Sequence, residues 1–156
     1  MSEYDVIVVG AGHAGCEAAL ASARLGCKTL LVTMNLHTIA CMSCNPSIGG
    51  IAKSHLVSEL DVLGGEMGRN ADYTGIQFRI LNTRKGPAVQ AIRVQCDKKA
   101  YSNRMADVIK NTKNLNIELG EVVNIIVKNG KAKGVLFNTG RAVNAKNIVL
   151  TTGTFM

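Results

Sequence analysis

The sequence predicts an α/β fold built on a parallel sheet, and three observations favour this class. An apolar run at residues 6–9 leads directly into a glycine-rich loop at residues 10–15, and an alanine-rich segment follows. A second apolar run within residues 28–33 completes a strand–helix–strand unit. Alternating runs on both sides of an Asn-Gly pair at 129–130 then indicate a β-meander. Strands and helices therefore alternate along the chain, with a long insertion between residues 34 and 95.

The glycine loop lies where a strand gives way to a helix, which is the position of a dinucleotide site. We expect the strand at 4–9 and the helix at 13–25. Gly10 permits a tight turn, Gly12 lets the backbone approach a pyrophosphate, and Gly15 lets the helix pack closely on the strand. The helix N-terminus offers N–H groups and partial positive charge to phosphates. The alternative is a structural turn that happens to be rich in glycine.

Periodicity and turn residues predict the elements that follow. Gly26 stands where a left-handed residue would end the first helix. Asn129-Gly130 predicts a tight hairpin turn. The insertion holds both prolines and many glycines, and long irregular segments are usually functional. The remaining expected elements are strands at 28–33, 116–119, 121–128, 133–138, 141–143 and 146–151, with helices at 51–63 and 91–111.

Length and composition indicate one domain with a real core. The chain has 156 residues, of which 47% are hydrophobic. No apolar run approaches the about 18 residues that span a bilayer, and the acidic N-terminus does not resemble a signal peptide. Five cysteines, an odd number scattered along the chain, do not indicate a disulfide framework. We therefore expect a cytoplasmic protein with reduced thiols, no membrane contact and no metal site.

The positive charge of the chain is concentrated in one segment. The formal net charge is +7, and residues 79–110 contain eight basic residues against two acidic ones. That segment thus accounts for six of the seven net charges, a pattern that suits a polyanion such as nucleic acid. The alternative is a solvated helix face with counterions.

Five segments of the sequence resemble the MnmG (GidA) family. These segments cover the glycine loop and the helix after it, the Cys-Asn-Pro loop, two parts of the insertion and the last strand. They are residues 10–19 (GAGHAGCEAA), 42–50 (MSCNPSIGG), 75–82 (GIQFRILN), 85–89 (KGPAV) and 150–155 (LTTGTF). The resemblance extends over essentially the whole chain. It implies a Rossmann-like FAD-binding domain at 1–156, with a parallel sheet, a β-meander and a long glycine-rich insertion.

The resemblance also implies an activity. The family binds FAD, reduces it with NADH, and builds a carboxymethylaminomethyl-type group on C5 of a tRNA wobble uridine, using methylenetetrahydrofolate. A GTPase of the MnmE type and a homodimer are the implied partners. Family members are several times longer, so we expect an N-terminal segment without the NADH-binding and C-terminal helical parts, inactive by itself. Two alternatives are a non-catalytic remnant that binds tRNA or a partner protein, and a generic FAD-dependent oxidoreductase domain.

The resemblance places cofactor contacts in the glycine loop and at four other positions. The acidic residue that usually binds the ribose after the second strand is absent, and Thr33 and Asn35 stand there instead. We expect His13 to be neutral because the helix dipole disfavours a cation. Val122 matches a position whose backbone meets the adenine, although it could be an ordinary strand valine. The implied cofactor residues are Gly10, Ala11, Gly12, His13, Ala14, Gly15, Thr33, Asn35, Val122 and Gly153.

Cys44 is the candidate catalytic residue. It lies in a Gly/Pro-rich loop before an expected helix start, where free N–H groups favour a thiolate. The alternative is an inert, packed thiol. Cys41 completes a C-x-x-C spacing, but no second pair matches it, so zinc is not expected. The implied nucleic-acid contacts are Arg79, Arg84, Lys85 and Arg93, with Tyr73 and Phe78 as candidates for base stacking.

Overall fold

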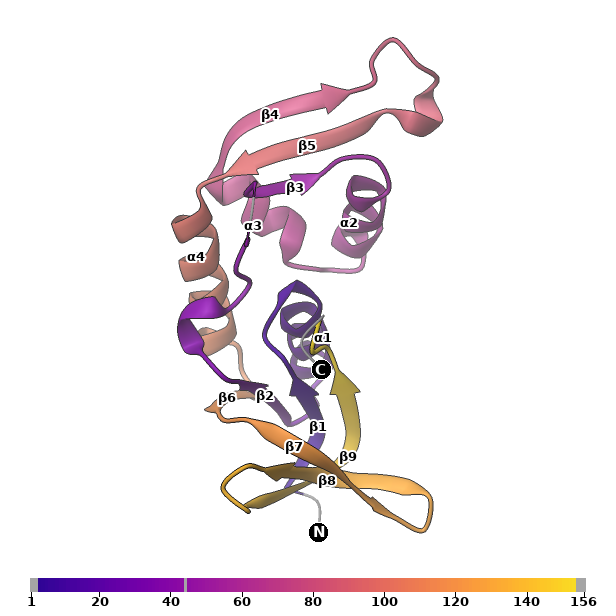
Figure 1. Cartoon of the computed structure of the whole chain (residues 1–156). Coiled ribbons are helices and arrows are strands. Elements are labelled where there is room, and N and C mark those ends of the chain that lie inside the picture. The colour runs from indigo at the N-terminus through magenta and orange to yellow at the C-terminus, as the bar shows by residue number, and fades with distance from the viewer. Residues whose placement is uncertain (1–2, 44, 154–156) are drawn as a thin grey trace. The chain divides into compact units, whose positions relative to one another are not determined.

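The structure, a computed structural model, describes residues 3–43 and 45–153. They form two compact units, drawn in Figure 1. Unit 1 comprises residues 3–40 and 106–153, and unit 2 comprises residues 41–43 and 45–105. Within these described ranges, no helix is long and apolar enough to cross a membrane.

Unit 1 is built on a six-stranded sheet with the strand order β6-β2-β1-β9-β8-β7. Its parallel part consists of β6, β2, β1 and the second half of β9, and its antiparallel part is the predicted meander. The α/β class and the parallel sheet are thus confirmed. The elements wholly inside unit 1 are β1 (Tyr4–Val9), α1 (His13–Arg24), β2 (Thr29–Thr33), η1 (Leu36–Thr38), β6 (Leu115–Leu119), β7 (Val122–Lys128), β8 (Lys131–Phe137) and β9 (Ala142–Leu150).

The last strand differs from the prediction. The sequence predicts two strands, at 141–143 and 146–151, but β9 is one continuous strand of nine residues. Its first residues pair antiparallel with β8, and its later residues pair parallel with β1. Polar residues at 144, 146 and 147 interrupt the apolar pattern without interrupting the strand, because a strand needs only one buried face. One strand therefore joins the meander to the parallel sheet.

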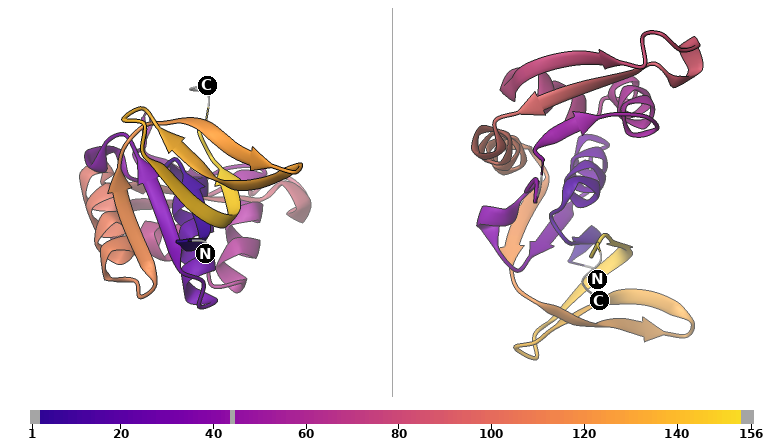
Figure 2. Two further views of the ribbon diagram at one scale, coloured as in Figure 1. Left: turned by 90° about the horizontal axis from the view of Figure 1, so that it is seen from below. Right: turned by 45° about the horizontal axis from the view of Figure 1, so that its top comes forward.

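One hydrophobic cluster of the unit 1 core lies between the parallel strands and the meander. Ile7 and Val32 point to the same cluster as Val135, Phe137 and Val143 from the meander strands. The views in Figures 1 and 2 show β7 and β8 crossing one face of the parallel strands. Helix α1 contacts β1 and β2, and its buried side chains include Cys16, Ala19, Leu20 and Ala23.

Two predicted turns are confirmed by backbone geometry. Asn129 and Gly130 both have positive φ, at 51° and 71°, as a type I′ hairpin turn requires. Gly26 has a φ of 89° and donates its N–H to Ala23 O at 3.0 Å, while Cys27 donates to Ser22 O at 3.1 Å. This pair of hydrogen bonds is a Schellman motif, and it ends α1 at the expected glycine.

Unit 2 contains a three-stranded antiparallel sheet with the order β3-β5-β4. The predicted helix at 91–111 is wrong in its first part, since residues 91–96 form β5 and the helix begins at Lys98. Asp97 marks the boundary: its carboxylate accepts hydrogen bonds from the N–H groups of Lys99 and Ala100 at 2.9 and 2.8 Å. The other elements are β3 (Ser47–Gly49), α2 (Lys53–Val62), α3 (Met67–Thr74), β4 (Gly75–Leu81), η2 (Pro87–Val89), β5 (Ala91–Cys96) and α4 (Lys98–Asn111), whose last residues belong to unit 1.

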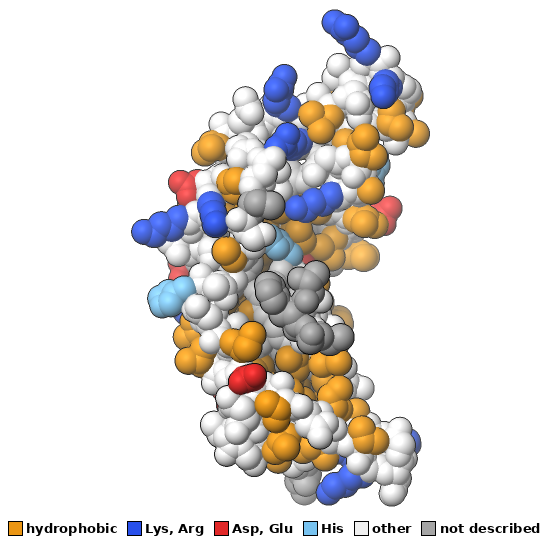
Figure 3. All heavy atoms as spheres, viewed as in Figure 1, with side chains coloured by type: hydrophobic (Ala, Val, Ile, Leu, Met, Phe, Trp, Pro, Cys, Tyr) orange, Lys and Arg blue, Asp and Glu red, His pale blue; other side chains and the backbone are white. Residues whose placement is uncertain are grey.

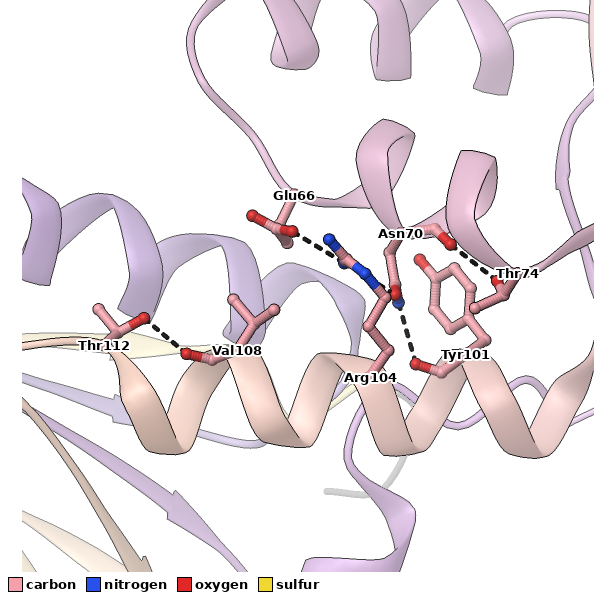
Figure 4. Close-up of polar contacts among 7 residues, drawn as sticks. All are labelled: Glu66, Asn70, Thr74, Tyr101, Arg104, Val108 and Thr112. Carbon is pink, nitrogen blue, oxygen red and sulfur yellow. Dashed lines mark hydrogen bonds and ion pairs between the residues drawn. The ribbon is translucent and has the colours of Figure 1, made fainter.

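A buried polar network fastens α3 to the first turns of α4 inside unit 2 (Figure 4). Arg104 forms an ion pair with Glu66 at 2.9 Å and donates a hydrogen bond to Asn70 Oδ1 at 3.0 Å. The Asn70 amide donates in turn to Tyr101 O at 3.0 Å, and the Thr74 hydroxyl donates to Asn70 O at 2.7 Å. Because Glu66 is only 3% exposed, water solvates its carboxylate poorly, and Arg104 supplies the counter-charge.

Candidate dinucleotide-binding site

The glycine loop of unit 1 is packed so tightly that two of its glycines have no room for a side chain. Gly10 has a φ of 103°, and a Cβ there would lie 2.4 Å from Thr151 O. A Cβ on Gly15 would lie 1.8 Å from Gly10 O. The first glycine therefore makes the turn off β1, and the third brings α1 against that turn, as the sequence predicts.

Gly12 differs from its two neighbours in the motif. It is exposed, and no atom lies within 4 Å of the position that its Cβ would take. It is also the N-cap of α1, and as a glycine it has no side chain to cap the helix; no acidic residue lies in the first turn. The missing Cβ therefore leaves an open space above helix N–H groups, which suits an anionic group.

Thr151 is a residue of this site that the sequence analysis did not single out. It follows β9, and its hydroxyl lies 3.0 Å from both Val9 O and Gly10 O, so that it donates to the turn between β1 and the glycine loop. Its N–H also donates to Val9 O at 2.9 Å. Its place after an apolar strand was visible in the sequence, but its partner was not, because Val9 lies 142 positions earlier in the chain.

The remaining residues of the loop are placed by the start of α1. Ala11 is buried, and its carbonyl accepts hydrogen bonds from Ala40 N at 2.9 Å and from the Cys16 thiol at 3.4 Å. Ala14 is exposed in the first turn, and His13 beside it is partly buried. The hydrogen bonds of Ala11 fix the loop backbone, while Gly12 and Ala14 remain exposed.

The segment after β2 is organised by its own side chains. Thr33 is buried, and its hydroxyl donates to Asn35 O at 3.2 Å. Asn35 is exposed and uses its side-chain oxygen to accept the His37 N–H at 2.9 Å, which caps η1. The Thr33 hydroxyl and both oxygens of Asn35 thus have local partners, and the Thr33 carbonyl accepts the Gly120 N–H at 2.9 Å. The side-chain NH2 of Asn35 is therefore the group of this segment that is best placed to meet a ribose.

Val122 and Gly153 occupy different environments in unit 1. The Val122 side chain packs partly buried against the core of the meander, and a break in pairing register follows it along β7. Gly153 comes three residues after β9 ends, with a φ of 68° and no atom within 4 Å of a Cβ position. The side chain of Val122 therefore serves packing, and only its backbone is left to contact a ligand.

The described cysteines differ in burial: Cys16 and Cys96 are buried, Cys27 is partly buried and Cys41 is exposed. Cys44 lies outside the described residues. Burial raises the pKa of Cys16 to about 12, and burial also raises the pKa of Cys96. Both thiols are therefore protonated at neutral pH, whereas Cys41 is exposed. Among the described residues, no three His, Cys, Asp or Glu side chains gather in a way that could hold a metal ion.

The four candidate nucleic-acid contacts all lie in unit 2, on the β4–β5 hairpin. Arg79 and Arg93 are cross-strand partners on β4 and β5, while Arg84 and Lys85 are exposed in the connecting segment. Residues 75–96 include no Asp or Glu. Figure 3 shows Lys and Arg side chains over this hairpin and its connection. The structure thus brings the four cations onto one hairpin, two as a pair and two at its end.

The strand order, the glycine loop and the meander define a Rossmann-like dinucleotide-binding fold. The same fold occurs in the GidA-related protein from Thermus thermophilus, with a TM-score of 0.69 over 99% of this chain and 55% of that chain at 18% identity. It also occurs in PqsL of Pseudomonas aeruginosa, a probable FAD-dependent monooxygenase, with a TM-score of 0.67 over 97% of this chain and 43% of that chain at 14% identity.

Sequence comparison identifies the family. The family model of glucose inhibited division protein A (GIDA) matches residues 5–156, and the chain belongs to this family. It is 60% identical to the tRNA uridine 5-carboxymethylaminomethyl modification enzyme MnmG of Geobacter sulfurreducens and 64% identical to that of Pelobacter propionicus. Each alignment covers 99% of this chain, but only 25% and 24% of those two relatives.

A solved structure agrees with this assignment. Aquifex aeolicus GidA matches with a TM-score of 0.96 at 57% identity, over 99% of this chain and 26% of that chain. The chain therefore spans about a quarter of the length of the relatives it matches. The resemblance to the MnmG (GidA) family that the sequence motifs indicate is confirmed.

Proposed function

We propose that this chain is the FAD-binding part of a flavoenzyme that modifies the wobble uridine of tRNA. The observation that carries the proposal is the glycine loop of unit 1. At Gly10 and Gly15 neighbouring backbone atoms leave no room for a Cβ, whereas the Cβ position of Gly12 is open and lies at the start of α1. Such a loop in a GidA family member, whose relatives are tRNA uridine modification enzymes, favours this function over a generic flavin-dependent oxidoreductase.

The residues present fit an FAD pyrophosphate. The N–H groups around Gly12 and the partial positive charge of the α1 terminus would bind the two phosphates. Ala11, His13 and Ala14 would line the same loop, and Asn35, positioned by the Thr33 hydroxyl, would meet the ribose. Val122, through its backbone, and Gly153 would border the rest of the cofactor. When bound, FAD supplies the reversible two-electron chemistry that this chain's own side chains lack.

The tRNA would be held through unit 2. Arg79, Arg84, Lys85 and Arg93 would contact phosphates, because Arg and Lys neutralise the nucleic-acid backbone. Tyr73 and Phe78 are the candidates for base stacking, since they are 77% and 56% exposed. The Arg104 guanidinium lies 4.3 Å from the centre of the Tyr73 ring, so a base would stack on the other face of that ring. Cys44 would be the reactive thiol during activation of the uridine ring. The whole enzyme would use NADH and methylenetetrahydrofolate, act as a homodimer with an MnmE-type GTPase, and work in the cytoplasm.

A segment exchange tests this proposal. Residues 1–156 replace the matching segment of a full-length MnmG relative, and the chimera is expressed in a strain that lacks the enzyme. Mass spectrometry of digested tRNA should then show the modified wobble nucleoside again. Cys44→Ser should abolish the modification and Cys41→Ser should leave it. A chimera that folds, binds FAD and leaves the tRNA unmodified would contradict the proposed function.

A further inference from the structure

The β4–β5 hairpin has two chemically different faces. Pairing places Gln77 opposite Gln95 and Arg79 opposite Arg93, so these four side chains share one face. The next pairs along the ladder alternate with them, and Phe78 faces Val94 on the other side. On that second face Val94 is 5% exposed, beneath the helices of unit 2 that contact β5. Val94 thus packs into unit 2 on the second face, whereas Gln77, Arg79, Arg93 and Gln95 are exposed or only partly buried on the polar face.

The pairing of Arg79 with Arg93 does not stabilise the hairpin. Like charges directly opposite one another in an antiparallel pair are destabilising. Among the described residues, neither guanidinium forms an ion pair, and residues 75–96 contain no carboxylate that could separate them. Strand β3 places no side chain directly beside Arg93, because the residue that pairs with Arg93 on β3 is Gly49. Two unneutralised cations held side by side indicate a binding role.

The same side chains line a small pocket. Its volume is about 80 Å³, and its walls are Gln77, Arg79, Leu81, Arg93 and Gln95. All four polar side chains carry N–H donors, and both guanidiniums present a planar fork that matches the oxygens of a phosphate. Organic ligands need pockets of roughly 300 Å³ or more. The pocket therefore suits one small oxyanion and excludes a nucleoside or a whole cofactor.

We propose that Arg79 and Arg93 form a two-arginine clamp for a single phosphate group, assisted by the amides of Gln77 and Gln95. This inference rests on the proposed function, because it takes the phosphate to be one of the tRNA backbone. It divides the four cations of the hairpin into two kinds. Arg79 and Arg93 fix one phosphate and so set the register of the bound strand, whereas Arg84 and Lys85 attract the backbone without fixing it.

Inorganic phosphate tests the clamp without any tRNA. Phosphate is titrated into the 156-residue chain, and the chemical shifts of β4 and β5 amides are followed by NMR. Arg79→Gln and Arg93→Gln should each weaken phosphate binding by roughly tenfold or more, the equivalent of one lost charge-assisted hydrogen bond. Arg84→Gln, which removes the same charge from the same hairpin, should change the affinity by less than about twofold. No saturable binding, or equal losses in all three variants, would overturn the clamp.

A neutral substitution separates the clamp from simple charge attraction. Gln77→Met removes a donor but no charge, so it should weaken phosphate binding by several-fold while the salt dependence of tRNA binding stays unchanged. Arg79→Gln should lower the slope of log affinity against log salt by about one. An unchanged phosphate affinity in Gln77→Met would show a diffuse cationic surface and contradict the clamp.

Two further measurements distinguish the clamp from a structural role of Arg79 and from the tRNA proposal. Thermal unfolding of Arg79→Gln should occur at the wild-type temperature or above it, since the substitution relieves repulsion; a lower temperature would mean a structural role and refute the clamp. If phosphate binds as described but tRNA does not, the clamp stands and the tRNA proposal fails. If tRNA binding depends equally on all four cations, tRNA recognition stands and the clamp fails.

Discussion

Two glycine-to-alanine substitutions in the same loop should separate folding from cofactor binding. At Gly15 the added Cβ would lie 1.8 Å from Gly10 O, far inside the about 3.5 Å of a favourable contact. The obstacle is backbone, so α1 must shift on β1. Overpacking of this kind costs about 3 kcal/mol. For a chain of this size, that lowers Tm by roughly 6–12 °C.

At Gly12 the same substitution meets open space. Gly12 has a φ of −69° and a ψ of −175°, which alanine also adopts, and no atom lies within 4 Å of the new Cβ. The cost to folding is then only the poorer N-cap, about 0.5–1 kcal/mol. The new methyl group would instead occupy the approach to the pyrophosphate, and FAD affinity should fall by about tenfold or more, the equivalent of about 1.4 kcal/mol.

The assay pairs thermal unfolding without cofactor, followed by circular dichroism, with a flavin fluorescence titration of each variant. Gly15→Ala should unfold early. Gly12→Ala should unfold near the wild type but bind FAD poorly. If Gly12→Ala binds FAD as tightly as the wild type, or unfolds as early as Gly15→Ala, the division of roles between the two glycines is wrong.

Three other substitutions test contacts within single units. Thr151→Val should destabilise the chain by about 1 kcal/mol, because the Val9 and Gly10 carbonyls lose a donor, and Thr151→Ser should restore it in urea unfolding. The pKa of Cys16 is about 12 in the folded state against an ordinary 9.0, so above about pH 9 the unfolded chain loses the thiol proton while the folded chain keeps it, and stability falls as the pH rises. Between about pH 8 and pH 10 the wild type should lose about 1 kcal/mol of unfolding free energy relative to Cys16→Ala. The same pH dependence of stability in both proteins would contradict this. Arg104→Met should cost about 3 kcal/mol by leaving Glu66 buried without its counter-charge, and much less when combined with Glu66→Gln in a double-mutant cycle.

Periodic segments with clear end signals were predictable from the sequence. The glycine loop predicted β1 and α1, Gly26 predicted the end of α1, and Asn129-Gly130 predicted the β7–β8 hairpin. In each case a short local pattern determines the structure, because the turn needs a residue that tolerates positive φ. The fold class followed from these patterns, and the family followed from five sequence motifs, three of which lie in the insertion.

The insertion was harder because its strands depend on partners distant in sequence. Residues 93–96 alternate between partly buried and buried positions, as a strand does. Residues 91–96 directly precede a real helix, and the prediction extended that helix backward. Asp97, which caps α4, was the signal that could have placed the boundary. With residues 91–96 assigned to a helix, the pairing of Arg79 with Arg93 could not be foreseen. Thr151 was missed for a related reason, since its partners lie at the other end of the chain.

The most direct test of the central claim compares two flavins. We propose that the glycine loop and the start of α1 bind the pyrophosphate of FAD, which riboflavin lacks together with the adenosine. Titrated into the chain at low salt, FAD should bind saturably, and riboflavin should bind at least about tenfold more weakly. Equal affinity for FAD and riboflavin, or no measurable binding of FAD, would show that the glycine loop does not bind the pyrophosphate.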